Sequence, residues 1–158
     1  NAEIYINSKE LAKKINKKTC VIYGGTPLTE LVSTRWKTQI NENAKSKAYA
    51  GSMPEVHHNE ILSWEANPQS SKNDYVLIFL RDSEEHPQIK KRFELTQKLL
   101  GDKVDIYNIE TKTSDSLLIK LMELVLFGDL FSLSLSDELG MIPEDIEAIE
   151  NLKEMLED

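Results

Sequence analysis

The sequence predicts an α/β fold, with a mainly parallel sheet of about four or five strands covered by helices in a three-layer, flavodoxin-like arrangement. Short apolar strands alternate along the chain with segments of helical periodicity. The segment 75–80 is apolar throughout, as in a strand buried on both faces. The 158 residues suit one domain, which is expected to span 1–158.

Capping residues, proline and glycines predict the helices and strands at the start of the chain. Ser8 suits an N-cap and precedes apolar residues at helical spacing, which predicts a helix over 8–17. The apolar run 20–23 predicts a strand that a glycine pair closes. Pro27 then opens a helix that extends to about residue 45, because proline is favoured at the first helical position. The small residues of 48–51 predict the second strand.

The middle of the chain predicts a short helix at 58–65, a polar loop at 67–73 and the apolar strand 75–80. Pro87 opens the next helix, and Gly101 ends it.

The last third predicts a strand at 104–109 and a long apolar helix that Ser114 caps and that runs to about residue 139. A break near Gly128 is an alternative to one continuous helix. Gly140 ends this segment, and Pro143 is expected to begin a last helix that runs to the C-terminus.

Composition excludes several classes of function. The net charge of −8 makes nucleic acid and anionic lipid unexpected partners, so any anion site must be a local pocket. The single cysteine, Cys20, supports neither a disulfide framework nor a metal cluster and is expected to be a buried small hydrophobe. No apolar stretch reaches the ~20 residues of a membrane span, and no signal peptide is visible, which predicts a cytoplasmic protein.

The predicted helix after Pro27 has a stripe of side chains on one face that is apolar at first and becomes polar toward the C-terminal end. Its apolar stripe continues as Arg35, Gln39 and Glu42, so a guanidinium, an amide and a carboxylate point the same way and are candidates for binding a substrate. Alternatively, the stripe simply enters solvent, where Glu42 and Lys45 form an exposed pair.

Two adjacent histidines stand before the helix at 58–65. His57 and His58 are too close in sequence to converge readily on one metal ion, and no cysteine is near them. One of them could act as a general acid or base, since its pKa is near neutral. A surface or capping histidine is the alternative.

Three further features are ambiguous. Lys153 falls on the apolar seam of the last helix and either extends to solvent or belongs to a site. Gly24, Gly25 and Thr26 form a turn before a helix N-terminus, where backbone N–H groups can bind an anion. The acidic run 82–85 is unsuited to phosphate and is expected to be a solvated loop.

The stretch 35–45 resembles the helix that carries the catalytic glutamate in the second sugar isomerase (SIS) domain of the bifunctional phosphoglucose/phosphomannose isomerases. The stretch 53–61 is similar to that family's Pro-Glu-x-x-His-Asn-Glu motif, and only its register selects His58 rather than His57. Weaker matches follow in the family's order and extend the resemblance over nearly the whole chain: 80–82 with Arg92, 128–132 and 149–153.

The resemblance implies roles for these residues. Glu42 would carry a proton between C2 and C1 of the sugar phosphate, while His58 and Lys153 would serve ring opening. Glucose 6-phosphate and mannose 6-phosphate would both yield fructose 6-phosphate, in glycolysis and gluconeogenesis. Neither metal nor cofactor is implied.

The resemblance also implies partners. The family's first SIS domain supplies a phosphate loop and an arginine that are not recognisable here, so the chain corresponds to the C-terminal half of the enzyme and is expected to be inactive alone. The family is dimeric, and His58 would act in the partner subunit's site. One departure is His57, which stands where the family usually has asparagine and would alter hydrogen bonding near His58.

Two other interpretations compete with this one. A non-catalytic SIS module would bind a sugar phosphate or mediate dimerisation, and would not need a carboxylate such as Glu42 facing the sugar. A plain flavodoxin-like domain with a chance match is the third.

Overall fold

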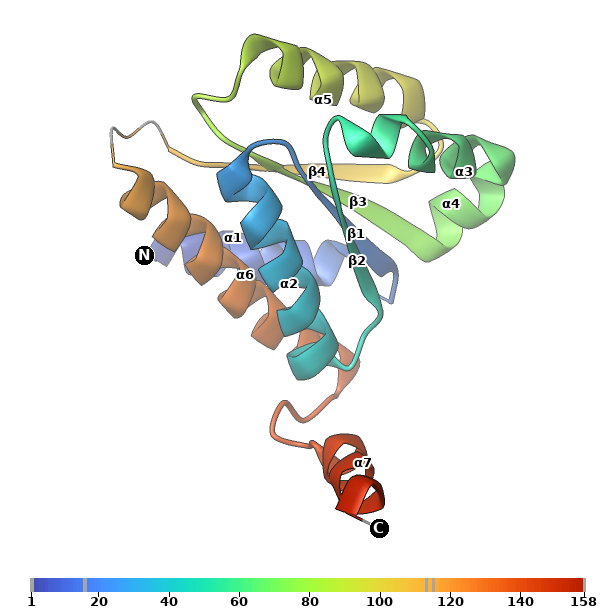
Figure 1. Cartoon of the computed structure of the whole chain (residues 1–158), viewed down its shortest axis with the longest axis vertical. Helices are drawn as coiled ribbons and strands as arrows, with labels where there is room; N and C mark the ends of the chain where they lie inside the picture. The colour runs from blue at the N-terminus through green and yellow to red at the C-terminus, as the bar shows by residue number, and fades with distance from the viewer. Residues whose placement is uncertain (1, 16, 113, 115, 158) are drawn as a thin grey trace.

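The computed structural model confirms the α/β prediction and describes residues 2–15, 17–112, 114 and 116–157 (Figure 1). Positions 16 and 158, which fall in the first and last predicted helices, lie outside the described residues. The helical elements are α1 (Ala2–Ile15), α2 (Pro27–Ala44), the 3₁₀ turn η1 (Glu55–His57), α3 (Glu60–Ala66), α4 (Pro68–Asp74), α5 (Pro87–Leu100), α6 (Leu117–Leu139) and α7 (Glu147–Glu157).

All four described strands are parallel, in the order β2-β1-β3-β4. They are β1 (Thr19–Gly24), β2 (Ala48–Ser52), β3 (Tyr75–Arg81) and β4 (Asp105–Glu110). The two central strands, β1 and β3, are buried at almost every residue, whereas the edge strands are only partly buried. This explains why the central strands are the continuous apolar runs of the sequence.

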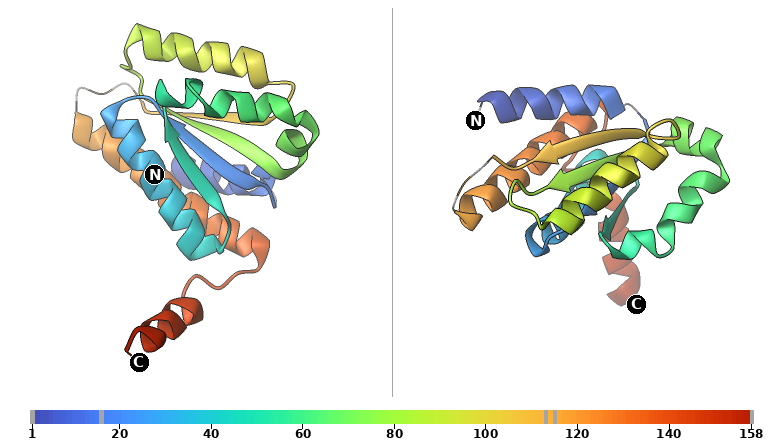
Figure 2. Two further views of the ribbon diagram at one scale, coloured as in Figure 1. Left: turned by 45° about the vertical axis from the view of Figure 1, so that its right-hand side comes forward. Right: turned by 90° about the horizontal axis from the view of Figure 1, so that it is seen from above.

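Helices cover both faces of the sheet and complete the three layers (Figure 2). The helices α1, α2 and α6 pack on the face that receives Ile22 and Ile78. The turn η1 and the helices α3 and α5 pack on the opposite face, which receives Tyr23 and Phe79. Successive strand residues point to opposite faces, so each central strand contributes to both cores. Cys20 is fully buried, as predicted, and burial raises the pKa of its thiol to about 12.

The helix α6 is continuous through Gly128, so the alternative of a break there is wrong. Gly128 instead provides room for the indole of Trp36, which stacks on Phe127 and Phe131 with ring centroids 5.5 and 5.6 Å away. The Trp36 indole N–H donates to the Leu124 carbonyl at 2.8 Å. A side chain at position 128 would overlap the indole ring, and this close approach is what requires glycine.

Two predicted caps are wrong. Ser8 lies inside α1 rather than before it, since the helix already begins at Ala2, and its hydroxyl donates to the Tyr5 carbonyl at 2.9 Å within the helix. Ser116, not Ser114, caps α6, and its hydroxyl accepts the Ile119 N–H at 3.4 Å. Before α6 two serines, Ser114 and Ser116, compete for the cap, and the sequence does not show which one faces a terminal N–H group.

The polar segment predicted as a loop forms the helix α4. Asn67 caps it by accepting the Ser70 N–H at 3.2 Å, and Pro68 takes the favoured first position. The last helix begins at Glu147, later than predicted, and the Asp145 side chain accepts the Glu147 N–H at its start, at 3.2 Å.

The last helix, α7, stands apart from the rest of the domain in Figure 1 and in the left view of Figure 2. None of its described residues is buried, although Ile149, Leu152 and Leu156 are large and apolar. Its apolar side chains therefore lack a core to enter within the described part of the chain. Among the described residues, no helix is both long and apolar enough to cross a membrane.

Candidate functional site

The predicted polar stripe of α2 lies along the outer side of the α2–α6 pair. One guanidinium nitrogen of Arg35, Nη2, donates to both carboxylate oxygens of Asp129 of α6, at 3.0 and 2.9 Å. Gln39 accepts a hydrogen bond from Asn43 at 3.1 Å. Glu42 is exposed, and its carboxylate makes no hydrogen bond or ion pair with any described residue. Of the three side chains, Glu42 is thus the one that makes no polar contact with a described residue.

The alternative pairing of Glu42 with Lys45 is not formed. The Lys45 ammonium donates instead to the backbone carbonyls of Glu42, at 2.6 Å, and of Pro143, at 3.1 Å. Lys45 also ends α2 in the left-handed conformation, with a φ of 51°. It therefore ties the end of α2 to the segment that leads into α7 and leaves the carboxylate unneutralised.

Glu42 and the beginning of α7 border one cleft of about 450 Å³. Its lining residues come from the end of α2 and from the start of the C-terminal segment: Asn41, Glu42, Lys45, Asp145, Ile146, Glu147, Ala148, Ile149 and Asn151. Lys153 is exposed and lies two residues beyond Asn151 on α7. The structure thus brings Glu42 and the helix of Lys153 to the same side of the domain.

The histidine segment lies on the opposite face, after β2. Val56 is 2% exposed and enters the core, whereas His58 and Asn59 are exposed. Glu60 accepts a hydrogen bond from the Tyr23 hydroxyl at 2.9 Å. The segment is therefore anchored on both sides of His58.

His57 contacts α5. Its Nε2 lies 2.7 Å from the Thr96 hydroxyl, and its Nδ1 lies 3.1 Å from an Arg92 nitrogen. The pKa of His57 is lowered, mainly by partial burial and to a lesser extent by the positive charge of Arg92. His57 is thus held against the domain while its neighbour His58 remains exposed, an arrangement that the sequence could not show.

Glu42 and His58 are not brought together within one chain. Glu42 precedes β2 on the face covered by α2, and His58 follows β2 on the face covered by η1 and α5. They therefore lie on opposite faces of the sheet and beyond opposite ends of the same strand. One chain alone cannot present both side chains to one sugar.

The Gly24–Thr26 turn satisfies its own donors. The N–H groups of Gly25 and Thr26 both donate to the Thr29 hydroxyl, at 2.9 and 3.0 Å, and the Thr29 N–H donates back to the Thr26 hydroxyl at 3.2 Å. Thr29 is 1% exposed. A ligand anion at this turn would have to replace the Thr29 hydroxyl, so a substrate role for Gly24, Gly25 and Thr26 stays a prediction.

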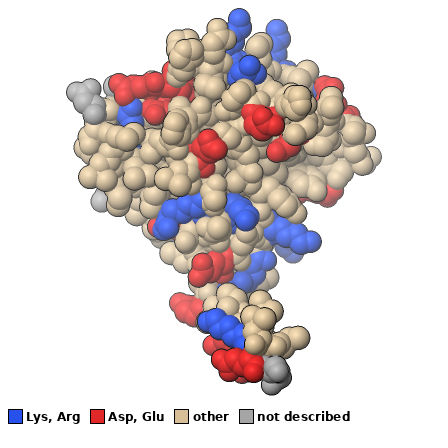
Figure 3. Space-filling model, viewed as in Figure 1, with Lys and Arg blue, Asp and Glu red and all other residues tan. Residues whose placement is uncertain are grey.

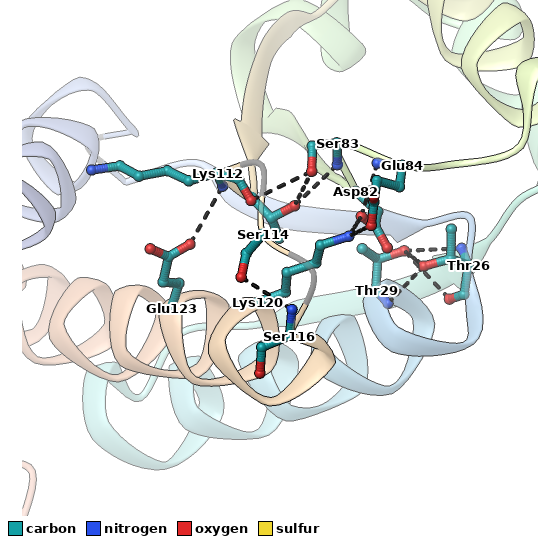
Figure 4. A network of polar contacts seen from close by, with 11 residues as sticks. Thr26, Thr29, Asp82, Ser83, Glu84, Lys112, Ser114, Ser116, Lys120 and Glu123 are labelled. Atoms are coloured by element: carbon teal, nitrogen blue, oxygen red, sulfur yellow. Dashed lines mark hydrogen bonds and ion pairs between the residues drawn. The ribbon is translucent and has the colours of Figure 1, made fainter.

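A buried lysine lies beside this turn (Figure 4). Lys120 of α6 is 3% exposed, and its ammonium pairs with Asp82, at 3.0 Å, and with Glu84. The hydrogen bonds and charges of the two carboxylates raise the pKa of Lys120 and outweigh the opposing effect of burial. The prediction that the acidic run is solvated is therefore wrong at Asp82, which is 9% exposed, and at Glu85, whose carboxylate is buried against Arg81.

This ion-paired group occupies the place where such folds commonly bind ligands. In doubly wound sheets that place is the crevice beyond the carboxyl ends of the strands, where the strand order reverses. Here it lies between β1 and β3, and Asp82 directly follows β3. The one available sequence signal was Lys120 itself, a charge within the apolar run of α6.

Comparison with known proteins identifies the family. The sequence profile of the "Bacterial phospho-glucose isomerase C-terminal SIS domain" matches residues 6–156. The chain belongs to this family. The resemblance to the phosphoglucose/phosphomannose isomerases and the SIS fold class are thereby confirmed.

Relatives and solved structures agree with this SIS assignment. The chain is 37% identical over 148 residues to a bifunctional phosphoglucose/phosphomannose isomerase of Aquifex aeolicus, covering 94% of the chain and 45% of that protein. A protein of the same name from Caldicellulosiruptor bescii is 34% identical over 153 residues, with 94% and 44% covered. A glucose-6-phosphate isomerase like protein of Thermus thermophilus matches in structure with a TM-score of 0.70 at 18% identity, over 87% of this chain and 45% of that one.

The SIS domain thus spans less than half the length of the curated relatives it matches. What these comparisons establish is the family and the fold. The roles of Glu42, His58, Lys153, Arg35 and Gln39 stay predictions.

Proposed function

We propose that this SIS domain is the C-terminal half of an enzyme that converts glucose 6-phosphate and mannose 6-phosphate into fructose 6-phosphate. The exposed carboxylate of Glu42 carries the proposal. It stands unpaired among the described residues, at the edge of a cleft, on the helix that resembles the family's catalytic helix. The names of the relatives support this substrate class.

In the proposed reaction, Glu42 removes the proton from C2 of the open-chain aldose and returns it to C1. A hydroxyl proton moves in the same direction, from O2 to O1, so an enediolate is the intermediate and no atom is lost. His58 and Lys153 exchange protons at the ring oxygen and the C1 hydroxyl during ring opening. Arg35 and Gln39 precede Glu42 on the same stripe of α2 and contact the sugar hydroxyls through the N–H groups that their bonds to Asp129 and Asn43 leave free.

The phosphate is proposed to bind in a preceding N-terminal SIS domain. Two observations support this. The backbone donors of the Gly24–Thr26 turn already have an acceptor in Thr29, and the ligand crevice between β1 and β3 holds the Lys120 ion pairs. A separate observation concerns the charge of the substrate. Lys and Arg side chains gather on the lower part of the body, next to α7, despite the net negative charge of the chain (Figure 3). Such a local basic area favours an anionic substrate.

The unpartnered apolar side chains of α7 support the same partner. Ile149, Leu152 and Leu156 are 48%, 58% and 77% exposed. Leaving three large apolar side chains of one helix in water is unfavourable in free energy, and such exposed apolar patches often mark an interface. We propose that the N-terminal domain of the same protein covers them and so places Lys153 next to the substrate. The chain alone is then folded but inactive.

The separation of Glu42 from His58 supports a homodimer. Because the two residues lie on opposite faces of the sheet, the His58 that serves one Glu42 comes from the partner subunit. Mixing inactive Glu42→Gln subunits with inactive His58→Ala subunits in the intact protein then restores activity, because one of the two sites in a mixed dimer is complete.

The deciding test measures fructose 6-phosphate formation by this chain and by the protein with its N-terminal domain. Only the longer protein is expected to be active, and Glu42→Gln is expected to lower kcat by about 10²–10⁴-fold, the usual contribution of a general base. Glu30→Gln is the matched control, since Glu30 is an exposed glutamate on the same helix. Full activity of Glu42→Gln would disprove the base assignment. A folded but inactive long protein would favour a non-catalytic SIS module.

A further inference from the structure

The segment around His58 has a hydrogen-bonded backbone and one exposed imidazole, that of His58. The His57 N–H donates to the Pro54 carbonyl at 3.0 Å, and the His58 N–H donates to the Glu55 carbonyl at 2.8 Å. These bonds form the turn η1, and Val56 anchors it in the core at 2% exposure. The backbone of His58 is therefore ordered, although its side chain faces solvent.

The second anchor of this turn is His57, and its contacts define where its proton lies. The Thr96 hydroxyl donates to the Arg92 carbonyl at 2.8 Å, so its oxygen is left to accept from Nε2 of His57 at 2.7 Å. The Arg92 guanidinium can only donate, so Nδ1 of His57 accepts from it at 3.1 Å. Both contacts require the neutral imidazole with its proton on Nε2.

We propose that His57, in this neutral form, is a positioning residue that fixes the direction in which the exposed His58 presents its imidazole. The inference rests on the proposed function, in which His58 exchanges protons with a sugar bound to the partner subunit. His57 touches no substrate in this scheme. It joins η1 to α5 through two hydrogen bonds, and this connection limits the tilt of the next residue in the chain.

The geometry explains why an imidazole suits this position. Its two nitrogens reach two different residues of α5, Arg92 and Thr96, which lie one turn apart. An asparagine, which the family motif usually has here, offers a shorter side chain with which to reach the same helix. Loss of both contacts would free the turn to move, and a misplacement of about 1 Å at a reacting group can cost ~10²-fold in rate.

The test is a double-mutant cycle in the intact protein, with kcat and KM for glucose 6-phosphate as the readout. His57→Phe keeps a ring but loses both hydrogen bonds, and is expected to lower kcat by about 10–100-fold at unchanged KM. In the His58→Ala background the same substitution is expected to have no further effect, because it acts only through His58. Losses that multiply in the double variant would overturn the inference.

Two further variants guard against a simple folding defect. His57→Gln keeps an N–H donor near the position of Nε2 and is expected to recover most of the activity. Thr96→Val removes the acceptor at similar volume and is expected to reproduce the loss in kcat. His86→Ala changes the third histidine of the chain, which caps α5, and serves as the control with near wild-type kinetics. A His57→Gln variant no better than His57→Phe would contradict the proposed connection.

Nitrogen chemical shifts of the His57 ring in this chain provide a measurement independent of catalysis. They are expected to show one tautomer, protonated at Nε2, and a ring protonated at Nδ1 would overturn the inference. An inactive wild-type protein, or an unimpaired His58→Ala variant, would instead overturn the proposed function together with this inference. The two failures are therefore distinguishable.

Discussion

Replacing Gly128 by alanine is the sharpest test of how α2 and α6 pack. In an isolated helix this change would be favourable, because alanine stabilises a helix interior by about 1 kcal/mol relative to glycine. In the structure, however, the added Cβ overlaps the indole of Trp36, which is 1% exposed and stacks on Phe127 and Phe131. The indole must move, and its hydrogen bond to the Leu124 carbonyl is then broken.

The two costs exceed the gain in helix propensity. Overpacking a core usually costs about 1–3 kcal/mol, and leaving a buried donor unpaired costs about 1–3 kcal/mol more. After the helix propensity is subtracted, Gly128→Ala is expected to destabilise the domain by about 1–5 kcal/mol. For a domain of this size each kcal/mol lowers Tm by about 2–4 °C.

Urea denaturation followed by tryptophan fluorescence and circular dichroism measures this change. The matched second variant is Trp36→Phe, whose smaller ring leaves room for a Cβ at position 128. In the Trp36→Phe background, Gly128→Ala is expected to cost clearly less than in the wild type. A Gly128→Ala protein as stable as the wild type, or about 1 kcal/mol more stable, would refute the close approach of indole and helix.

Three further predictions follow from single contacts. Lys120→Met is expected to lower the urea midpoint, because a buried carboxylate loses its partner, whereas Lys112→Met at an exposed pair is expected to leave the midpoint unchanged. An NMR titration is expected to place the pKa of His57 below its ordinary 6.5. Because the pKa is lower in the folded chain, the unfolded chain binds more protons at acid pH. The contribution of His57 to the free energy of unfolding is therefore present above about pH 6.5 and is lost as pH falls through its native pKa. The His57→Asn variant should not show this loss. Lys153→Ala is expected to leave the urea midpoint unchanged, because Lys153 is exposed on a helix with no buried residue, and a large shift would show that α7 is packed in solution.

Much of the fold was accessible from local sequence patterns. The strands near 20–23 and 75–80 were predictable because central strands of a parallel sheet are buried on both faces and so appear as unbroken apolar runs. Proline and glycine placed the beginning of α2 and the two ends of α5. The helix α4 was missed because its sequence is polar and its stability comes from the cap at Asn67 rather than from an apolar face.

The candidate site, like the fold, was predictable from the sequence only in part. The residue types at Glu42, His58 and Lys153, and their resemblance to a family, were visible in the sequence, because motif spacing is a local property. Their separation across the sheet was not, since it depends on which face each helix covers. The partners of His57, the Lys120 ion pairs and the fit of Trp36 against Gly128 join residues from 35 to 92 positions apart. No local pattern encodes such pairs, because only the folded chain brings their side chains into contact.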